Sequence, residues 1–149
     1  MSECIFCAIS SGRLPASRVW EDEAFIAFMD IFPMRPGHVL IIPRHHVDRL
    51  HELPVDERAA LFTLGTRIAA AQRATGADDV NYIINDGPAA NQSVPHVHLH
   101  VVPRRRGDTL RLLGRLLRKP VEGLLGPTNR GVLDSLAREL GTALERPRP

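Results

Sequence analysis

Three histidines occupy alternate positions of one short segment, which reads His96-Val97-His98-Leu99-His100-Val101-Val102. Because the side chains of a β-strand alternate between two faces, a strand here predicts three imidazoles on one face and apolar side chains on the other. Neighbouring imidazoles would then lie about 6.5–7 Å apart along the strand. Near neutral pH such groups exchange protons, attack phosphorus or bind metal ions. This segment is therefore the strongest functional signal in the chain.

Three interpretations fit a strand face rich in histidine. It could be a catalytic zinc site with three histidine ligands, a set of core histidines satisfied by hydrogen bonds, or one nucleophile flanked by groups that orient it and hold an anion. The preceding residues 85–94 form a polar turn of small residues, which can direct backbone N–H groups and hydroxyls at an anion. This turn favours the third interpretation. The chain has no glycine-rich loop ending in Lys-Ser or Lys-Thr, which excludes a phosphate-loop nucleotidase.

At this point the chain resembles the histidine triad family of nucleotide hydrolases and transferases. The family motif His-x-His-x-His, followed by apolar residues, is met by the segment just described. Further segments resemble family landmarks in the same order, and together they cover residues 4–106: Phe28-Met29-Asp30-Ile31, Pro36-Gly37-His38-Val39-Leu40-Ile41-Ile42-Pro43, Asn85-Asp86-Gly87 and Gln92-Ser93.

The resemblance implies covalent catalysis by a histidine. His98 would attack the α-phosphorus of a nucleotide, and water would then cleave the nucleotidyl-histidine intermediate. A backbone carbonyl near His96 would hold the second ring nitrogen of the nucleophile. His100 would hydrogen-bond the phosphate oxygens, Ser93 would protonate or orient the leaving group, and His38 would support the polar network behind the nucleophile.

The resemblance also implies a nucleotide-binding set. The Asp30 carboxylate would accept the hydroxyl protons of the ribose. Four apolar residues would line the base pocket, although ordinary core packing is an equal alternative for them. Asn85, Gln92, Ser93 and the backbone near Val94 would hold the phosphate. The residues expected to contact a purine nucleotide are thus Phe6, Ile9, Leu14, Asp30, Ile31, Asn85, Gln92, Ser93 and Val94.

The pair Cys4-Ile5-Phe6-Cys7 suggests a second site. Two such thiols can form a redox pair, remain reduced and unliganded, or supply half of a tetrahedral structural zinc site. The chain resembles the zinc-containing, bacterial-type branch of the family, which implies that His46 and His96 complete the zinc ligands, with the adjacent His45 as the rival of His46. His96 would then fix the strand through the metal while His98 stays available for chemistry.

Three features depart from the family pattern. Asn91 stands where the family usually has glycine, and asparagine is the best substitute if the position needs a positive φ. Pro95 stands where a larger residue is usual, and it removes one N–H donor. Residues 107–149 carry no family motif, so the leaving group and the substrate preference stay open.

The elements that must position these residues can be predicted from periodicity and turns. Strands are expected at 18–20, 25–29, 38–42, 80–85 and 96–102. A long helix from about Asp56 to Gly76 separates the third strand from the fourth. A second helix near the C-terminus is marked by Leu133, Leu136, Leu140 and Leu144. Short turns predict an α+β fold around an antiparallel, meander-like sheet.

Length and composition indicate one domain spanning residues 1–149. The chain is 44% hydrophobic and 24% charged, and its net charge of only +2 gives no support for nucleic-acid binding. No apolar run reaches the ~20 residues of a membrane span, and the N-terminus lacks the features of an export signal, so a cytoplasmic location is expected. The basic stretch 104–119 is expected to be a solvated helix face whose leucines pack on the domain, with a membrane-surface or polyanion-binding role as the alternative.

We therefore expect a homodimeric hydrolase that acts on purine nucleoside 5′-monophosphate derivatives such as phosphoramidates and acyl-adenylates. The two-fold dimer is implied by the resemblance alone. One alternative keeps the same nucleophile but cleaves dinucleoside polyphosphates, because Asp86-Gly87-Pro88 and Val102-Pro103-Arg104 resemble that branch of the family. The other alternative is a purine-nucleotide-binding protein without turnover.

Overall fold

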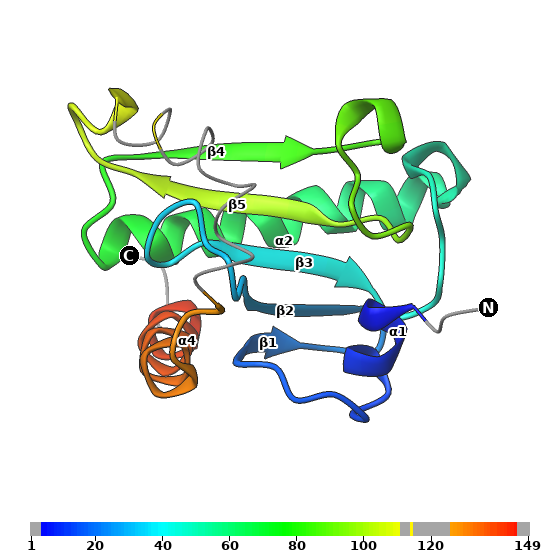
Figure 1. The fold of residues 1–149 in the computed structure, drawn as a ribbon, viewed down its shortest axis with the longest axis horizontal. Helices are drawn as coiled ribbons and strands as arrows, with labels where there is room; N and C mark the ends of the chain where they lie inside the picture. Colours follow the sequence, from blue (N-terminus) through cyan, green and yellow to red (C-terminus); the bar gives the residue numbers. More distant parts are fainter. Residues whose placement is uncertain (1–3, 111–113, 115–125, 146–149) are drawn as a thin grey trace.

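The computed structural model, which describes residues 4–110, 114 and 126–145, contains one antiparallel sheet of five strands (Figure 1). The strands are β1 (Arg18–Glu21), β2 (Phe25–Met29), β3 (Val39–Pro43), β4 (Asp79–Ile84) and β5 (Leu99–Arg104). Their order across the sheet is β1-β2-β3-β5-β4. The predicted α+β fold with five antiparallel strands is thus confirmed.

The predicted meander holds only for the first three strands. After β3 the chain crosses the sheet through helix α2 (Val55–Ala74) and returns as β4 at the outer edge. β5 then fills the position between β3 and β4, and pairs with both. This insertion places β5, which begins within the histidine segment, between two strands that pair with it.

Both predicted helices are present. α2 begins at Val55, directly after Pro54, with Asp56 and Glu57 in its first turn, where carboxylates favour the positive end of the helix. Gly76, just after α2, adopts a φ of +104°, as expected of a glycine at a helix end. The C-terminal helix is α4 (Arg130–Glu145). Among the described residues, no helix is both long enough and apolar enough to cross a lipid bilayer.

A short N-terminal helix, α1 (Ile5–Ser10), was not predicted. Six residues are too few for a clear helical repeat, so only the Cys-x-x-Cys spacing marked this segment. Two 3₁₀ turns, η1 (Leu50–Glu52) and η2 (Pro88–Ala90), lie in the connections next to the histidine segment. Half of the stretch 104–119 lies outside the described residues, because 111–113 and 115–119 are not described.

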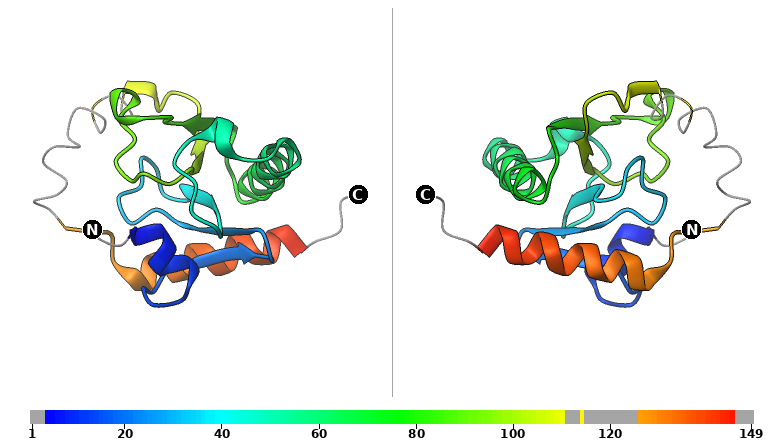
Figure 2. Two further views of the ribbon diagram at one scale, coloured as in Figure 1. Left: turned by 90° about the vertical axis from the view of Figure 1, so that its right-hand side faces the viewer. Right: turned by 90° about the vertical axis from the view of Figure 1, so that its left-hand side faces the viewer.

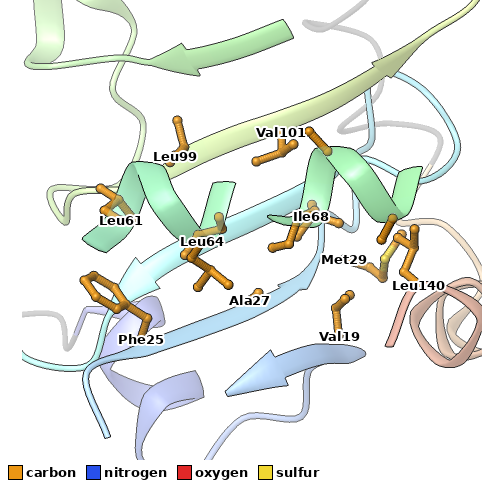
Figure 3. Close-up of a cluster of buried hydrophobic side chains, with 14 of the residues drawn as sticks. Val19, Phe25, Ala27, Met29, Leu61, Leu64, Ile68, Leu99, Val101 and Leu140 are labelled. Atoms are coloured by element: carbon orange, nitrogen blue, oxygen red, sulfur yellow. The ribbon is translucent and has the colours of Figure 1, made fainter. Parts of the chain in front are cut away.

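The two faces of the sheet carry different cores. α2 and α4 cover one face, where the large apolar cluster lies (Figures 2 and 3). α2 lies so near the sheet at Gly65 that an added Cβ would come within 2.8 Å of Leu99. α1 covers a smaller cluster on the opposite face, made of Phe6, Ile9, Ile26, Phe28, Leu40 and Ile42.

Asp108 closes the turn after β5 and binds three arginines. Its Oδ1 accepts hydrogen bonds from Nε and Nη2 of Arg104 at 3.0 and 2.6 Å, and its Oδ2 accepts one from the Arg105 backbone N–H at 3.0 Å. The Nε of Arg35 lies 3.3 Å from Oδ2. The Arg104 hydrogen bonds hold the pKa of this carboxyl below its usual range, against the opposing effect of burial.

Replacing Asp108 with Asn is expected to lower the free energy of unfolding by about 2–3 kcal/mol at pH 7, because charged hydrogen bonds are lost. The folded-state pKa lies below the unfolded value. The contribution is therefore complete above about pH 4 and is lost as the pH falls through the folded-state pKa. Urea unfolding of both proteins along a pH series measures the effect. A difference in stability that does not shrink in acid would contradict this account.

Candidate active site and metal centre

The histidine segment is extended, but only its last histidine lies within a paired strand. The prediction of a strand from residue 96 is wrong at its start, because β5 begins at Leu99. His96 and His98 precede the first ladder pairs, and the Val97 N–H donates instead to the carbonyl of Val47 at 2.8 Å. The predicted alternation still holds, since Leu99 and Val101 lie in the large core cluster of the opposite face.

A neighbouring backbone carbonyl fixes the orientation of His98, the central histidine. The Nδ1 of His98 lies 2.7 Å from the carbonyl oxygen of His96, so Nδ1 carries the proton and donates it there. This tautomer leaves the lone pair on Nε2. The ring packs edge-on against Phe6 and His100, with centroid separations of 5.2 and 4.8 Å. It is 4% exposed, so only a small part of the imidazole can meet a ligand.

Two further histidines, His38 and His100, form a contacting pair next to His98. Nε2 of His38 lies 3.0 Å from Nδ1 of His100, and both rings are buried. The Met34 backbone N–H donates to Nδ1 of His38 at 3.1 Å, which requires a lone pair on that nitrogen. The proton of His38 is therefore on Nε2 and is donated to His100. His100 accepts at Nδ1 and, when neutral, carries its own proton on Nε2.

Asp30 lies next to this pair. Its Oδ1 accepts the Phe32 backbone N–H at 2.9 Å, and its Oδ2 lies 3.2 Å from Nδ1 of His38. Because Met34 already donates to that nitrogen, the carboxylate–ring contact is a close approach rather than a hydrogen bond. The Asp30 side chain remains 16% exposed, so part of the carboxylate can still meet a ligand.

The loop 85–95 folds back on itself before the histidines. Asn91 has φ 63° and ψ 32°, the left-handed conformation anticipated for this position. The side chain of Gln92 braces the loop, because its Oε1 accepts the Gly87 N–H at 2.7 Å and its Nε2 donates to the Asp48 carbonyl at 2.9 Å. Ser93 is exposed, whereas Asn85 and Val94 are half-buried.

The four apolar residues expected around a base divide into two pairs. Phe6 and Ile9 are buried in the smaller core cluster, while Leu14 and Ile31 are 40% and 37% exposed. The carbonyl of Ile31 accepts the N–H of Thr128 at 2.9 Å, which brings the segment before α4 to this side of the site. No motif or periodicity in the sequence indicates that contact.

A hollow of about 540 Å³ opens beside the loop. Its walls combine the end of the loop with the N-terminal helix and the start of the connection after β3. The lining residues are Cys4, Ile5, Cys7, His46, Asp48, Ser93, Val94 and Pro95.

The two cysteines lie with two histidines in one compact group, Cys4, Cys7, His46 and His96, whose donor atoms all lie within 4.8 Å of one another. Nδ1 of His96 lies 3.5 and 3.7 Å from the Sγ atoms of Cys4 and Cys7, and Nδ1 of His46 lies 3.3 Å from Sγ of Cys7. Ligands of a tetrahedral zinc ion are separated by about 3.5 Å when the usual Zn–S and Zn–N distances hold. The four residues therefore fit a structural zinc ion. His45 lies outside the group, with its Nδ1 3.7 Å from Glu57.

Both histidines of this group are oriented by oxygen atoms on their far sides. Nε2 of His96 donates to the Pro43 carbonyl at 2.9 Å, and Nε2 of His46 lies 2.7 Å from Oδ1 of Asp48. Each ring thus turns an unprotonated Nδ1 toward the thiols, an arrangement common around zinc. Burial lowers the pKa of His96 to about 4, against a smaller opposing effect of the Pro43 hydrogen bond. At neutral pH this ring is in the neutral form that binds metals.

The buried histidines His38, His98 and His100 on a five-stranded α+β fold, beside a Cys₂His₂ group, define a small histidine triad protein. The chain belongs to the HIT domain family, whose model matches residues 11–107. It is 47% identical over 118 residues to an uncharacterized HIT-like protein of Mycobacterium tuberculosis, covering 78% of this chain and 82% of the relative. It is 37% identical over 101 residues to an adenosine 5′-monophosphoramidase of Schizosaccharomyces pombe, covering 68% of this chain and 74% of that enzyme.

A solved structure shares both the fold and the sequence. The crystal structure of a Zn-bound histidine triad family protein from Mycobacterium smegmatis has a TM-score of 0.79 and 41% identity to this chain. The similarity covers 95% of this chain and 93% of that protein. It therefore extends beyond the matched domain and includes the region of α4.

Proposed function

We propose that this protein hydrolyses nucleoside 5′-monophosphate derivatives, with phosphoramidates and acyl-adenylates as the preferred class. The observation that carries the proposal is the orientation of His98, whose Nδ1 donates to the His96 carbonyl and whose Nε2 therefore carries the lone pair. A neutral imidazole with a fixed tautomer is a good nucleophile near neutral pH. The phosphoramidase name of one relative supports this substrate class.

The proposed reaction has two steps. In the first, the Nε2 lone pair of His98 attacks the α-phosphorus, the bond from phosphorus to the leaving group breaks, and the leaving group takes a proton from Ser93 or water. In the second, water attacks the same phosphorus and gives its proton to Ser93, or to solvent where water supplied the first proton. The phosphorus–nitrogen bond then breaks, and its electron pair returns to Nε2. The products are a nucleoside 5′-monophosphate and the free leaving group.

The surrounding residues would bind and stabilise the nucleotide. His100 would donate from Nε2 to a phosphate oxygen as negative charge develops. Asp30 would accept the ribose hydroxyls with the exposed part of its carboxylate, and Ile31 and Leu14 would contact the purine. Asn85, Ser93 and the backbone at Val94 would hold the phosphate. Gln92 would act mainly by holding the loop, because both ends of its amide already have partners.

Zinc is proposed as a structural ion held by Cys4, Cys7, His46 and His96. When bound it would supply no chemistry to the substrate, but would fix α1 and the start of the histidine segment relative to each other. The fit of the donor atoms and the zinc-bound relative support this assignment.

Trapping the intermediate tests the proposed function. The protein is mixed with adenosine 5′-phosphoramidate and quenched within milliseconds, and peptides are analysed by mass spectrometry. An adenylyl group on His98 is expected. Diadenosine polyphosphate is assayed in parallel, and a higher kcat/KM on it would favour the alternative substrate class. Binding of nucleotide with neither an adduct nor turnover would leave only a nucleotide-binding protein.

His38 is expected to be a positioning residue that fixes the tautomer of His100. His38→Ala removes the Nε2–H donor and is expected to lower kcat about 10–100-fold with little change in the affinity for nucleotide. His38→Gln offers an N–H at a similar place and is expected to restore part of the rate. Steady-state kinetics of both variants measure this. Equal losses in the two variants would contradict a role in hydrogen bonding.

We also propose that two copies pair through β4, the edge strand of the sheet. Tyr82 on β4 is 39% exposed, its ring lies near Gly65 of α2, and Phe62 on the same helix is 43% exposed. An open strand edge beside apolar side chains is typical of a strand-to-strand interface. Light scattering should give twice the chain mass, and Tyr82→Glu is expected to shift it toward the monomer. A monomeric wild-type protein would refute the dimer.

A further inference from the structure

A short connection, residues 46–50, lies between the Cys₂His₂ group and the loop 85–95. It begins with a member of the group, His46. Its backbone then accepts the Val97 N–H at the carbonyl of Val47, 2.8 Å away, and the Leu50 N–H donates to Oδ1 of Asp86 at 3.2 Å. The connection is therefore hydrogen-bonded both to the histidine segment and to the loop.

Asp48 lies at the centre of this connection, and both its carboxylate and its backbone carbonyl make polar contacts. Its carboxylate Oδ1 lies 2.7 Å from Nε2 of His46, on the side of the ring that faces away from the thiols. Its backbone carbonyl accepts Nε2 of Gln92 at 2.9 Å. The side chain is 50% exposed, so a substitution there does not disturb the core.

Gln92 continues the same path into the loop. The side-chain Oε1 of Gln92 accepts the Gly87 N–H at 2.7 Å, and the backbone N–H of Gln92 donates to the Gly87 carbonyl at 3.1 Å. The side-chain amide of Gln92 can take only one orientation, because the Gly87 N–H needs its oxygen and the Asp48 carbonyl needs its nitrogen. Ser93, which follows directly, is exposed at the hollow.

We propose that Asp48 is a positioning residue that couples the metal group to the phosphate-binding loop, so that zinc and a nucleoside 5′-phosphate bind cooperatively. The inference rests on the proposed function for the identity of the nucleotide. Zinc orders His46, Asp48 holds the ordered ring, and Gln92 transmits the position of Asp48 to Gly87 and Ser93. A loop that is already ordered loses less conformational freedom when it binds a phosphate, and by linkage the nucleotide strengthens zinc binding equally.

The experiment measures zinc affinity by competition with a chromophoric chelator, with and without saturating AMP. For the wild-type protein, AMP is expected to raise the zinc affinity about 5-fold or more. Asp48→Asn is expected to lower the zinc affinity about 10–100-fold, because the orienting charge is lost. Gln92→Leu is expected to leave the zinc affinity without AMP unchanged and to abolish the increase that AMP causes. Asp56→Asn, an exposed acid on α2, is the matched control.

Cobalt substitution supplies a readout independent of catalysis. The visible bands of bound Co²⁺ report the geometry of the ligands, and AMP is expected to shift them in the wild-type protein but not in Gln92→Leu. An unchanged zinc affinity in Asp48→Asn overturns the proposal, whatever AMP does. An unchanged zinc affinity in wild-type protein that binds AMP by calorimetry also overturns it. A protein that binds no AMP refutes the proposed function instead, and the Asp48→Asn result then still decides the role of Asp48.

Discussion

His98→Asn is expected to reduce turnover of adenosine 5′-phosphoramidate by about 10⁴–10⁶-fold, the range found when an enzyme loses its nucleophile. Asparagine can still donate to the His96 carbonyl, but its amide nitrogen is not basic and cannot attack phosphorus as the imidazole Nε2 would. The affinity for AMP is expected to change little, because phosphate and ribose contacts come from other residues. Single-turnover kinetics and calorimetry measure the two quantities separately.

The matched control is His51→Asn, an exposed histidine of η1. It is expected to keep full activity. Thermal unfolding of His98→Asn should resemble that of the wild-type protein, so that a loss of rate cannot be attributed to misfolding. An active His98→Asn protein would reject covalent catalysis by this histidine.

Removal of zinc is expected to have the largest effect on stability. A ligand that binds only the folded state at about 1,000 times its Kd contributes about 4 kcal/mol, which corresponds to a Tm change of about 8–16 °C for a chain of this size. Chelation or Cys7→Ala is expected to remove that contribution. Scanning calorimetry with added zinc, and again after chelation, measures it.

Two observations separate this account from its rivals. His45→Ala, next to a ligand but outside the group, is expected to keep the zinc-dependent Tm shift, whereas His46→Ala is expected to lose most of it. Below its own unfolding transition, the chelated protein is expected to retain the chemical step. Complete loss of that step on chelation would indicate instead a catalytic zinc bound by the three histidines of the motif.

Much of the fold followed from periodicity. The short apolar runs 25–29 and 38–42, bounded by turns, predicted two strands, which are buried on both faces. The spacing of Leu61, Leu64 and Ile68 predicted α2, because burial on one side of a helix imposes this period. The position of β5 between β3 and β4 could not be predicted, since the order of strands depends on where α2 returns the chain. Helix α1 was too short to produce a period.

The residues of the candidate site were recognised by type, and the backbone carbonyl at His96 was expected as the partner of His98, but most other partners were not predicted. The spacing Cys-x-x-Cys and the pair His45-His46 allowed two ligand sets, and only the direction of the chain after β3 decides between them. Nothing in the sequence distinguishes the Pro43 carbonyl that orients His96, because every residue has a carbonyl group. Gln92 was expected at the phosphate, whereas its amide bridges Gly87 and Asp48, two contacts that depend on tertiary structure.

The hydrogen bond from Thr128 to the Ile31 carbonyl places a stretch without any motif next to Ile31, a residue that we propose contacts the purine. Selection on that stretch can therefore alter which nucleobase is accepted while every histidine stays as it is. Relatives that catalyse one reaction can therefore differ in nucleobase preference through their C-terminal segments. Exchanging residues 126–129 between two such relatives is a direct way to exchange that preference.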